Sequence, residues 1–66
     1  MNILKLRGKM VEHCVNVEAL ASVLEIDRAT LYRKLNDGEK FTIGEARKIN
    51  AVLELTKEEV NEIFFA

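Results

Sequence analysis

Four basic side chains near the middle of the chain are the residues best suited to chemistry with a polyanion. The whole chain has 10 basic and 11 acidic residues and a net charge of −1, but residues 28–40 have a local excess of bases. The basic residues of this segment are Arg28, Arg33, Lys34 and Lys40, and the acidic ones are Asp37 and Glu39. Guanidinium and ammonium groups donate hydrogen bonds to phosphate oxygens. The segment is therefore a candidate binding surface for a polyanion.

Catalytic and metal-binding constellations are missing from the sequence. His13 and Cys14 are adjacent, but neighbouring helical positions point about 100° apart, and the chain has no other histidine or cysteine to complete a ligand set. We find no glycine-rich phosphate loop, no suitably spaced carboxylate pair, and no serine or cysteine with a partner base. A chain this short also leaves no room for a pocket of roughly a few hundred cubic ångströms. We therefore expect no enzyme activity, no cofactor, no metal and no small-molecule ligand.

Length and hydropathy narrow the class of protein further. Residues 1–66 are expected to make one domain, because independent domains usually need at least about 50 residues. The longest apolar run, Ile63 to Ala66, is far shorter than the about 20 residues of a membrane span. The N-terminus also lacks the apolar stretch of a signal peptide. These features predict a cytoplasmic protein without membrane association.

Apolar periodicity and capping signals predict an all-α chain of five short helices. Asn16 and Asp27 are suitable N-caps, and Thr42 and Thr56 each begin a capping box, with a glutamate three residues later. No segment has the alternating pattern of a strand. The expected helices cover residues 3–13, 17–24, 28–35, 43–53 and 57–64, and the third ends in the turn residues Asn36, Asp37 and Gly38.

The second and third predicted helices are separated by only about three residues, which forces them to cross sharply. In the third helix Leu31 and Leu35 point inward, while Arg28, Ala29, Tyr32 and Arg33 form an outward polar and aromatic face. A helix, a short turn and a second helix with a basic outer face are typical of the helix-turn-helix, which lays its second helix in the DNA major groove.

The stretch from Val17 to Asn36, VEALASVLEIDRATLYRKLN, resembles the helix-turn-helix of the phage repressor and Cro family, also called the XRE type. Ala21 matches the small residue where the two helices touch. Apolar residues match the positions that lock the pair together, at Leu20, Leu24, Ile26 and Leu31. The resemblance extends over nearly the whole chain. The phrase TLYRKLN and the ending EIFF are similar to small prophage and mobile-element regulators of Gram-positive bacteria.

This resemblance implies a five-helix lambda-repressor-like domain and a sequence-specific transcriptional regulator, a repressor or Cro-like protein, that binds double-stranded DNA. Two positions depart from the family pattern. Glu25 replaces the glycine that is common in the turn, at a cost of about 1 to 2 kcal/mol if the left-handed geometry is kept. Val17 replaces a glutamine that often contacts phosphate, so only the backbone N–H of Val17 can serve there.

By matching motif positions, the resemblance assigns base reading to Arg28, Ala29 and Arg33. It assigns phosphate contacts to Val17, Tyr32, Lys34, Asn36 and Lys40. The alternative for the two arginines is an ordinary solvated role, and the alternative for Tyr32 is packing against helix 43–53.

The C-terminal segment predicts a homodimer that would read a palindromic operator. A 66-residue core is marginal in stability, and Ile63, Phe64 and Phe65 crowd one end of the chain. Neighbours on a helix cannot face the same way. Because Phe64 continues the stripe of Val60 at a spacing of four, we expect Phe65, together with Ile63, in the dimer interface.

Two other functions remain open at this point. The helical scaffold and the net negative charge would also suit an adaptor that binds another protein. A DNA-binding subunit for recombination or excision would share the mechanism of DNA recognition but not its outcome.

Overall fold

The computed structural model describes residues 1–37 and 40–65, and its regular structure is entirely helical over those ranges. The helices are α1 (Ile3–Glu12), α2 (Val17–Leu24), α3 (Arg28–Asp37), α4 (Ile43–Leu53) and α5 (Lys57–Phe64). The predicted all-α fold is thus confirmed. Two predicted ends were wrong by a residue or two, since α1 ends at Glu12 and α3 continues through Asp37. Gly38, expected in the turn after α3, lies outside the described residues.

Each helix begins at a side chain that accepts a hydrogen bond from the first turn. These N-terminal residues are Asn2, Asn16, Asp27, Thr42 and Thr56. Both predicted capping boxes are present, with Thr42 paired to Glu45 and Thr56 paired to Glu59. Because the caps satisfy backbone N–H groups that have no partner within the helix, they fix where short helices begin.

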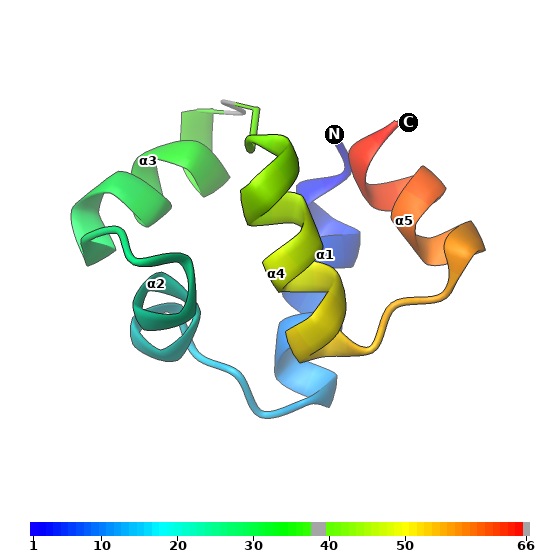
Figure 1. The fold of residues 1–66 in the computed structure, drawn as a ribbon, viewed down its shortest axis with the longest axis horizontal. Coiled ribbons are helices and arrows are strands. Elements are labelled where there is room, and N and C mark those ends of the chain that lie inside the picture. The colour runs from blue at the N-terminus through cyan, green and yellow to red at the C-terminus, as the bar shows by residue number, and fades with distance from the viewer. Residues whose placement is uncertain (38–39, 66) are drawn as a thin grey trace.

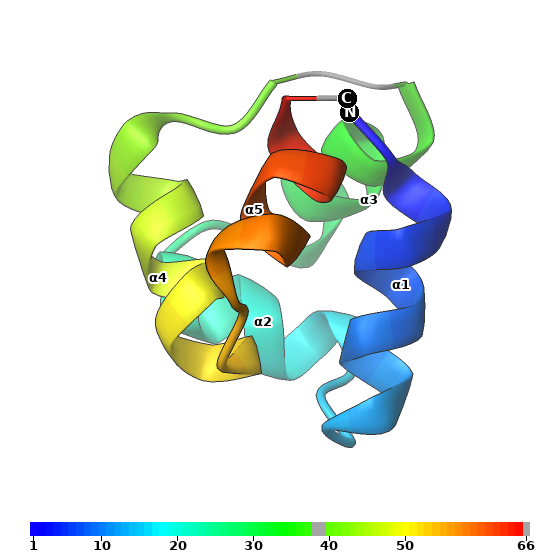
Figure 2. The ribbon, with the colours of Figure 1, turned by 90° about the vertical axis from the view of Figure 1, so that its right-hand side faces the viewer.

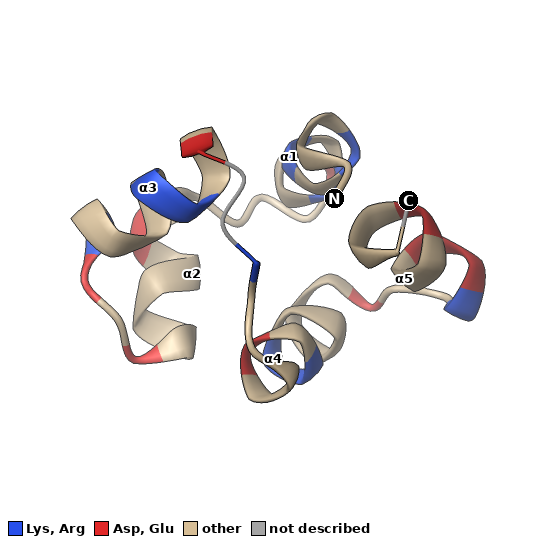
Figure 3. Cartoon of the chain, turned by 90° about the horizontal axis from the view of Figure 1, so that it is seen from above, with Lys and Arg blue, Asp and Glu red and all other residues tan. Residues whose placement is uncertain are grey.

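In the view of Figure 1, α4 lies in front of α1, with α2 and α3 to its left and α5 to its right. Seen from above, α2 and α3 lie on one side and α5 on the other, with α1 and α4 between them (Figure 3). The start of α1 and the end of α5 lie close together (Figure 2). There the backbone N–H of Asn2 donates to the carbonyl of Ile63 over 2.8 Å.

Ion pairs join α1 to α5. The Lys9 ammonium lies 2.6 Å from a carboxylate oxygen of Glu59 and 2.9 Å from one of Glu12, and Lys5 pairs with Glu62. The hydrogen bond from Lys9, followed by the one from the backbone of Thr56, lowers the pKa of Glu59 to about 2. The charged form of Glu59 is therefore the form that this packing of α1 on α5 favours.

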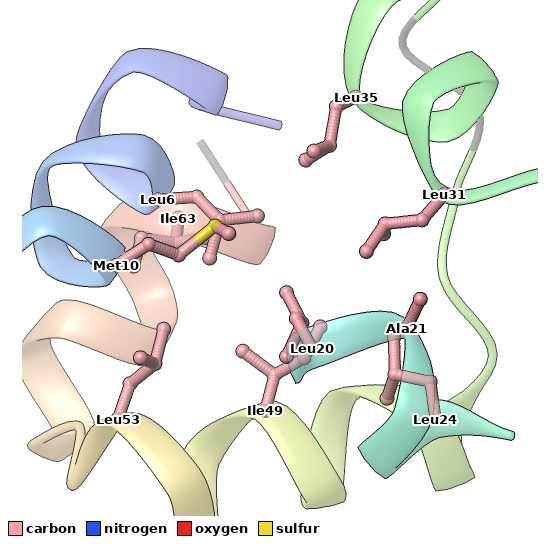
Figure 4. Packing of buried hydrophobic residues seen from close by; sticks show 10 residues of the cluster. All are labelled: Leu6, Met10, Leu20, Ala21, Leu24, Leu31, Leu35, Ile49, Leu53 and Ile63. Atoms are coloured by element: carbon pink, nitrogen blue, oxygen red, sulfur yellow. The ribbon is translucent and has the colours of Figure 1, made fainter. Parts of the chain in front are cut away.

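Side chains from all five helices meet in one core (Figure 4). Its buried members are Leu6, Met10, Leu20, Ala21, Leu24, Leu31, Leu35, Ile49, Leu53 and Ile63. Burying a leucine or isoleucine side chain contributes about 1.5 to 3 kcal/mol. Leu31 and Leu35 belong to this set, so the core fixes the rotation of α3 about its own axis and decides which of its residues face outward.

The turn between α2 and α3 keeps a left-handed residue although it has no glycine. Glu25 has φ 58° and ψ 36°, and the N–H of Ile26 donates to the carbonyl of Ala21 over 3.1 Å. This arrangement satisfies the last carbonyl groups of α2. Glu25 therefore keeps a left-handed backbone conformation and bears the strain that a glycine at this position would avoid.

Candidate nucleic-acid interface

The outward surface of α3, which we call the α3 face, is formed by residues one helical turn apart. They are Arg28, Ala29, Tyr32, Arg33 and Asn36, and all are exposed. Leu31 and Leu35, on the opposite side of the helix, are buried. All three residues predicted to read bases lie on the α3 face. Basic segments are also visible on α3 in the charge-coloured view (Figure 3).

Arg28 begins the α3 face and is paired with α2. Its Nη1 donates to a carboxylate oxygen of Glu18 over 2.8 Å, and the two side chains are 61 % and 70 % exposed. Exposed ion pairs contribute only about 0 to 1 kcal/mol. The guanidinium of Arg28 can therefore leave Glu18 for a stronger acceptor at small cost.

Arg33 lies about one turn further along the same face. It is close enough to Asp27 for its positive charge to lower the pKa of that carboxyl group. Hydrogen bonds from the Thr30 side chain and then from the Thr30 backbone lower the pKa of Asp27, and the positive charge of Arg33 lowers it further. Asp27 caps α3 by accepting from Thr30 N over 2.7 Å. The start of α3 is thus held by an ionised cap, with two arginines on the surface beside it.

Lys34 lies on the side of α3 that meets α4 and not on the α3 face, and its predicted phosphate contact stays a prediction. Its side chain is only 15 % exposed, and its ammonium lies 3.4 Å from a Glu45 carboxylate oxygen and 5.6 Å from the centroid of the Phe41 ring. Both partners lie beyond the end of α3, in or just before α4. Lys34 therefore fastens α3 to α4, because a pairing charge and an aromatic face already occupy its ammonium.

A groove of about 390 Å³ runs beside the α3 face, between α1 and α3 and up to the start of α2. We call it the α1–α3 groove. Its lining includes Met10, Leu35, Val17, Arg28, Tyr32 and Arg7. The expectation that so small a chain has no room for a pocket of this size was wrong. Three predicted contact residues, Val17, Arg28 and Tyr32, are brought together here.

Arg7 is a residue of this surface that the sequence did not single out. Its Nη2 donates to the side-chain oxygen of Asn36, on the α3 face, over 2.9 Å. The two residues are 29 positions apart, so no local pattern links them. Tyr32 lines the same groove and is 43 % exposed.

Lys40 is exposed and lines a second groove, of about 280 Å³, which we call the aromatic groove. Phe41 and Phe64 meet there edge to face, with ring centroids 6.3 Å apart. Ile43 and Phe65 also line it and are each 78 % exposed. An apolar surface of this kind is suited to contact with another macromolecule.

The two residues predicted in a dimer interface occupy different places. Phe65 is exposed and Phe64 packs against the core, as their spacing from Val60 predicts. The placement of Ile63 was wrong, because this side chain has no exposed surface within a single chain. Ile63 therefore supports the fold, and the dimer prediction is left with Phe65.

His13 and Cys14 have no site around them. Cys14 is exposed, and His13 lies 3.8 Å from a carboxylate oxygen of Glu54. Within residues 1–37 and 40–65 no group of three or more ligating side chains is placed to hold a metal ion.

Comparisons with known proteins do not identify a family for this chain. No family model, curated protein or solved structure matches it. Among the described helices, none is both long and apolar enough to cross a lipid bilayer.

Proposed function

We propose that the chain is a sequence-specific DNA-binding protein of the helix-turn-helix type that regulates transcription by inserting α3 into the major groove. The observation that carries this proposal is the orientation of α3. The core buries Leu31 and Leu35, and the same rotation presents Arg28, Ala29 and Arg33 together on one exposed face. An α-helix fits the width of the major groove of B-form DNA.

On this proposal the arginines read guanine. The guanidinium fork spans the O6 and N7 atoms of guanine, and each good bidentate contact contributes about 1 to 3 kcal/mol of discrimination. Ala29, between them, is small enough to let α3 approach the base edges and to touch a thymine methyl group. The Glu18 partner of Arg28 is lost on binding, at the small cost of an exposed pair.

Phosphate contacts would come from groups around the α3 face. The backbone N–H of Val17 at the start of α2, the hydroxyl of Tyr32, the amide of Asn36 and the ammonium of Lys40 are the candidates. Such contacts set the register of the protein on the duplex without reading sequence. Residues 28–40 have an excess of positive charge, so this region can attract phosphate groups although the whole chain has a net charge of −1.

The partner in solution is a second copy of the chain. Exposed Phe65 and Ile43 border the aromatic groove, so one surface offers both projecting and recessed apolar parts, which suits a two-fold contact. A two-fold pair that spaces its recognition helices about 34 Å apart would read the half-sites of a palindrome.

Binding to duplex DNA separates this proposal from a protein-binding adaptor. The chain would be titrated against a fluorescently labelled duplex of random sequence, with anisotropy read over a series of salt concentrations. We expect saturable binding whose log affinity falls with log salt at a slope of roughly −3 to −6 per dimer. Absence of binding, or a slope near zero, would favour the adaptor. A role in recombination would give the same binding result and would differ in the position of the target sites.

A further inference from the structure

The basic residues of α1 are divided between two sides of the helix. Lys5 and Lys9 pair with Glu62 and Glu59 on α5. Arg7 points the other way and lines the α1–α3 groove, where its guanidinium bonds to Asn36. The two lysines therefore have a structural role in joining α1 to α5, which Arg7 does not share.

Arg7 places a second guanidinium across the groove from the α3 face. A guanidinium has five N–H donors in a planar fork, and the bond to Asn36 uses one of them. Arg28 lies on the same groove, and the start of α2 at Val17 supplies backbone N–H groups with no partner inside their own helix. Donors from three separate helices thus border one recess.

The lining of the groove combines apolar and charged side chains. Its floor includes the buried side chains of Met10 and Leu35, against which a sugar can pack. Glu18 is the acidic residue in the lining, and its carboxylate is paired with Arg28 at 2.8 Å. Among the residues that the structure describes, no carboxylate is paired with the guanidinium of Arg7, whose hydrogen-bond partner is the Asn36 side chain.

We propose that the α1–α3 groove seats a phosphodiester group of the DNA backbone and that Arg7 is the cation that binds it, an inference that rests on the proposed function. The contact would fix the distance between α1 and the duplex, and so hold α3 at its depth in the major groove. It carries no sequence information, because phosphate groups are the same at every base step.

The test compares Arg7→Ala with the wild-type chain on two duplexes, one of random sequence and one bearing a preferred site. We expect the affinity for both duplexes to fall by the same factor, roughly tenfold. The slope of log affinity against log salt should become less negative by about 1 for each protomer that loses the contact. Circular dichroism would show an unchanged helical content, because Arg7 is exposed.

Two further variants serve as controls. Lys57→Ala removes one positive charge from the exposed start of α5, away from the groove, and should leave the salt slope unchanged. Arg7→Lys keeps the charge without the fork, and should retain the slope while recovering part of the affinity. If wild type binds DNA and Arg7→Ala binds with the same affinity and slope, the inference is overturned and the proposed function stands. If wild type binds no duplex, the proposed function itself fails.

Discussion

Arg28 and Glu18 join the first turns of α3 and α2 through a 2.8 Å hydrogen-bonded ion pair on the surface proposed to meet DNA. The pair holds the arginine in place in the free protein. In the proposed complex with DNA, it would also set the negative charge of Glu18 beside the phosphate backbone. The same contact therefore preorganises Arg28 and opposes binding.

Glu18→Gln is expected to tighten DNA binding by about 0.5 to 1 kcal/mol, because it removes a repelled charge and releases Arg28 from an exposed pair. The gain should shrink as salt is raised. Anisotropy titrations at two salt concentrations measure it. Glu58→Gln, which removes an equal charge from exposed α5, is the control. Weaker binding by Glu18→Gln would show that the preorganisation of Arg28 outweighs the repulsion.

Glu25→Gly is expected to stabilise the fold. Glu25 holds a φ of 58°, and relief of about 1 to 2 kcal/mol of left-handed strain outweighs the larger entropy that glycine has in the unfolded chain. We expect a net gain of about 0.5 to 1 kcal/mol, and in a chain of this size each 1 kcal/mol raises Tm by about 4 to 8 °C. Glu25→Ala should show no such gain, since alanine keeps the same strain. Equal Tm values for Glu25→Gly and Glu25→Ala would contradict this account of the turn.

Stability should fall in acid through Glu59. Because its pKa is lowered from 4.5 to about 2 by Lys9 and the Thr56 cap, folding favours the ionised form. This contribution is fully present above pH 4.5 and is lost as the pH falls toward 2. Glu59→Gln keeps a side chain able to complete the capping box but has no charge, so its Tm should change less steeply over that range. Parallel Tm profiles for the two proteins would count against the pairing of Lys9 with Glu59.

Phe65→Glu should prevent the proposed homodimer from forming and weaken the proposed DNA binding, while leaving the helical content unchanged because the side chain is 78 % exposed. Ile63→Ala should instead destabilise the fold, by about 2 to 5 kcal/mol, since Ile63 is fully buried. Sedimentation velocity and circular dichroism distinguish the two effects. A wild-type chain that stays monomeric well above its DNA-binding concentrations would rule out this interface.

Local interactions explain why the helices were predictable. The caps at Thr42 and Thr56 form between residues three positions apart, so their pattern is complete in the sequence. The inward direction of Leu31 and Leu35 likewise follows from helical spacing. It requires only that one face of the helix be buried.

The parts that were not predictable depend on how helices cross. Lys34 meets Glu45 and Phe41 only because α4 packs beside the end of α3, and Arg7 meets Asn36 only because α1 lies across the groove. The spacing of the apolar residues did not reveal that Ile63 is buried. The start of the chain lies against the end of α5, where the backbone N–H of Asn2 donates to the carbonyl of Ile63. Sequence therefore identified most of the α3 face, while its borders required the tertiary structure.

The central claim is that Arg28 and Arg33 on α3 read base sequence, and selection of bound sites from a pool of random duplexes tests it most directly. We expect wild type to enrich a palindromic site with guanines at the arginine positions. Arg28→Ala and Arg33→Ala should each lose about 1 to 3 kcal/mol of specific binding and relax the preference at their own positions, while Lys40→Ala should weaken all duplexes about equally. An enriched site whose base preferences are the same in wild type and in both arginine variants would contradict the claim.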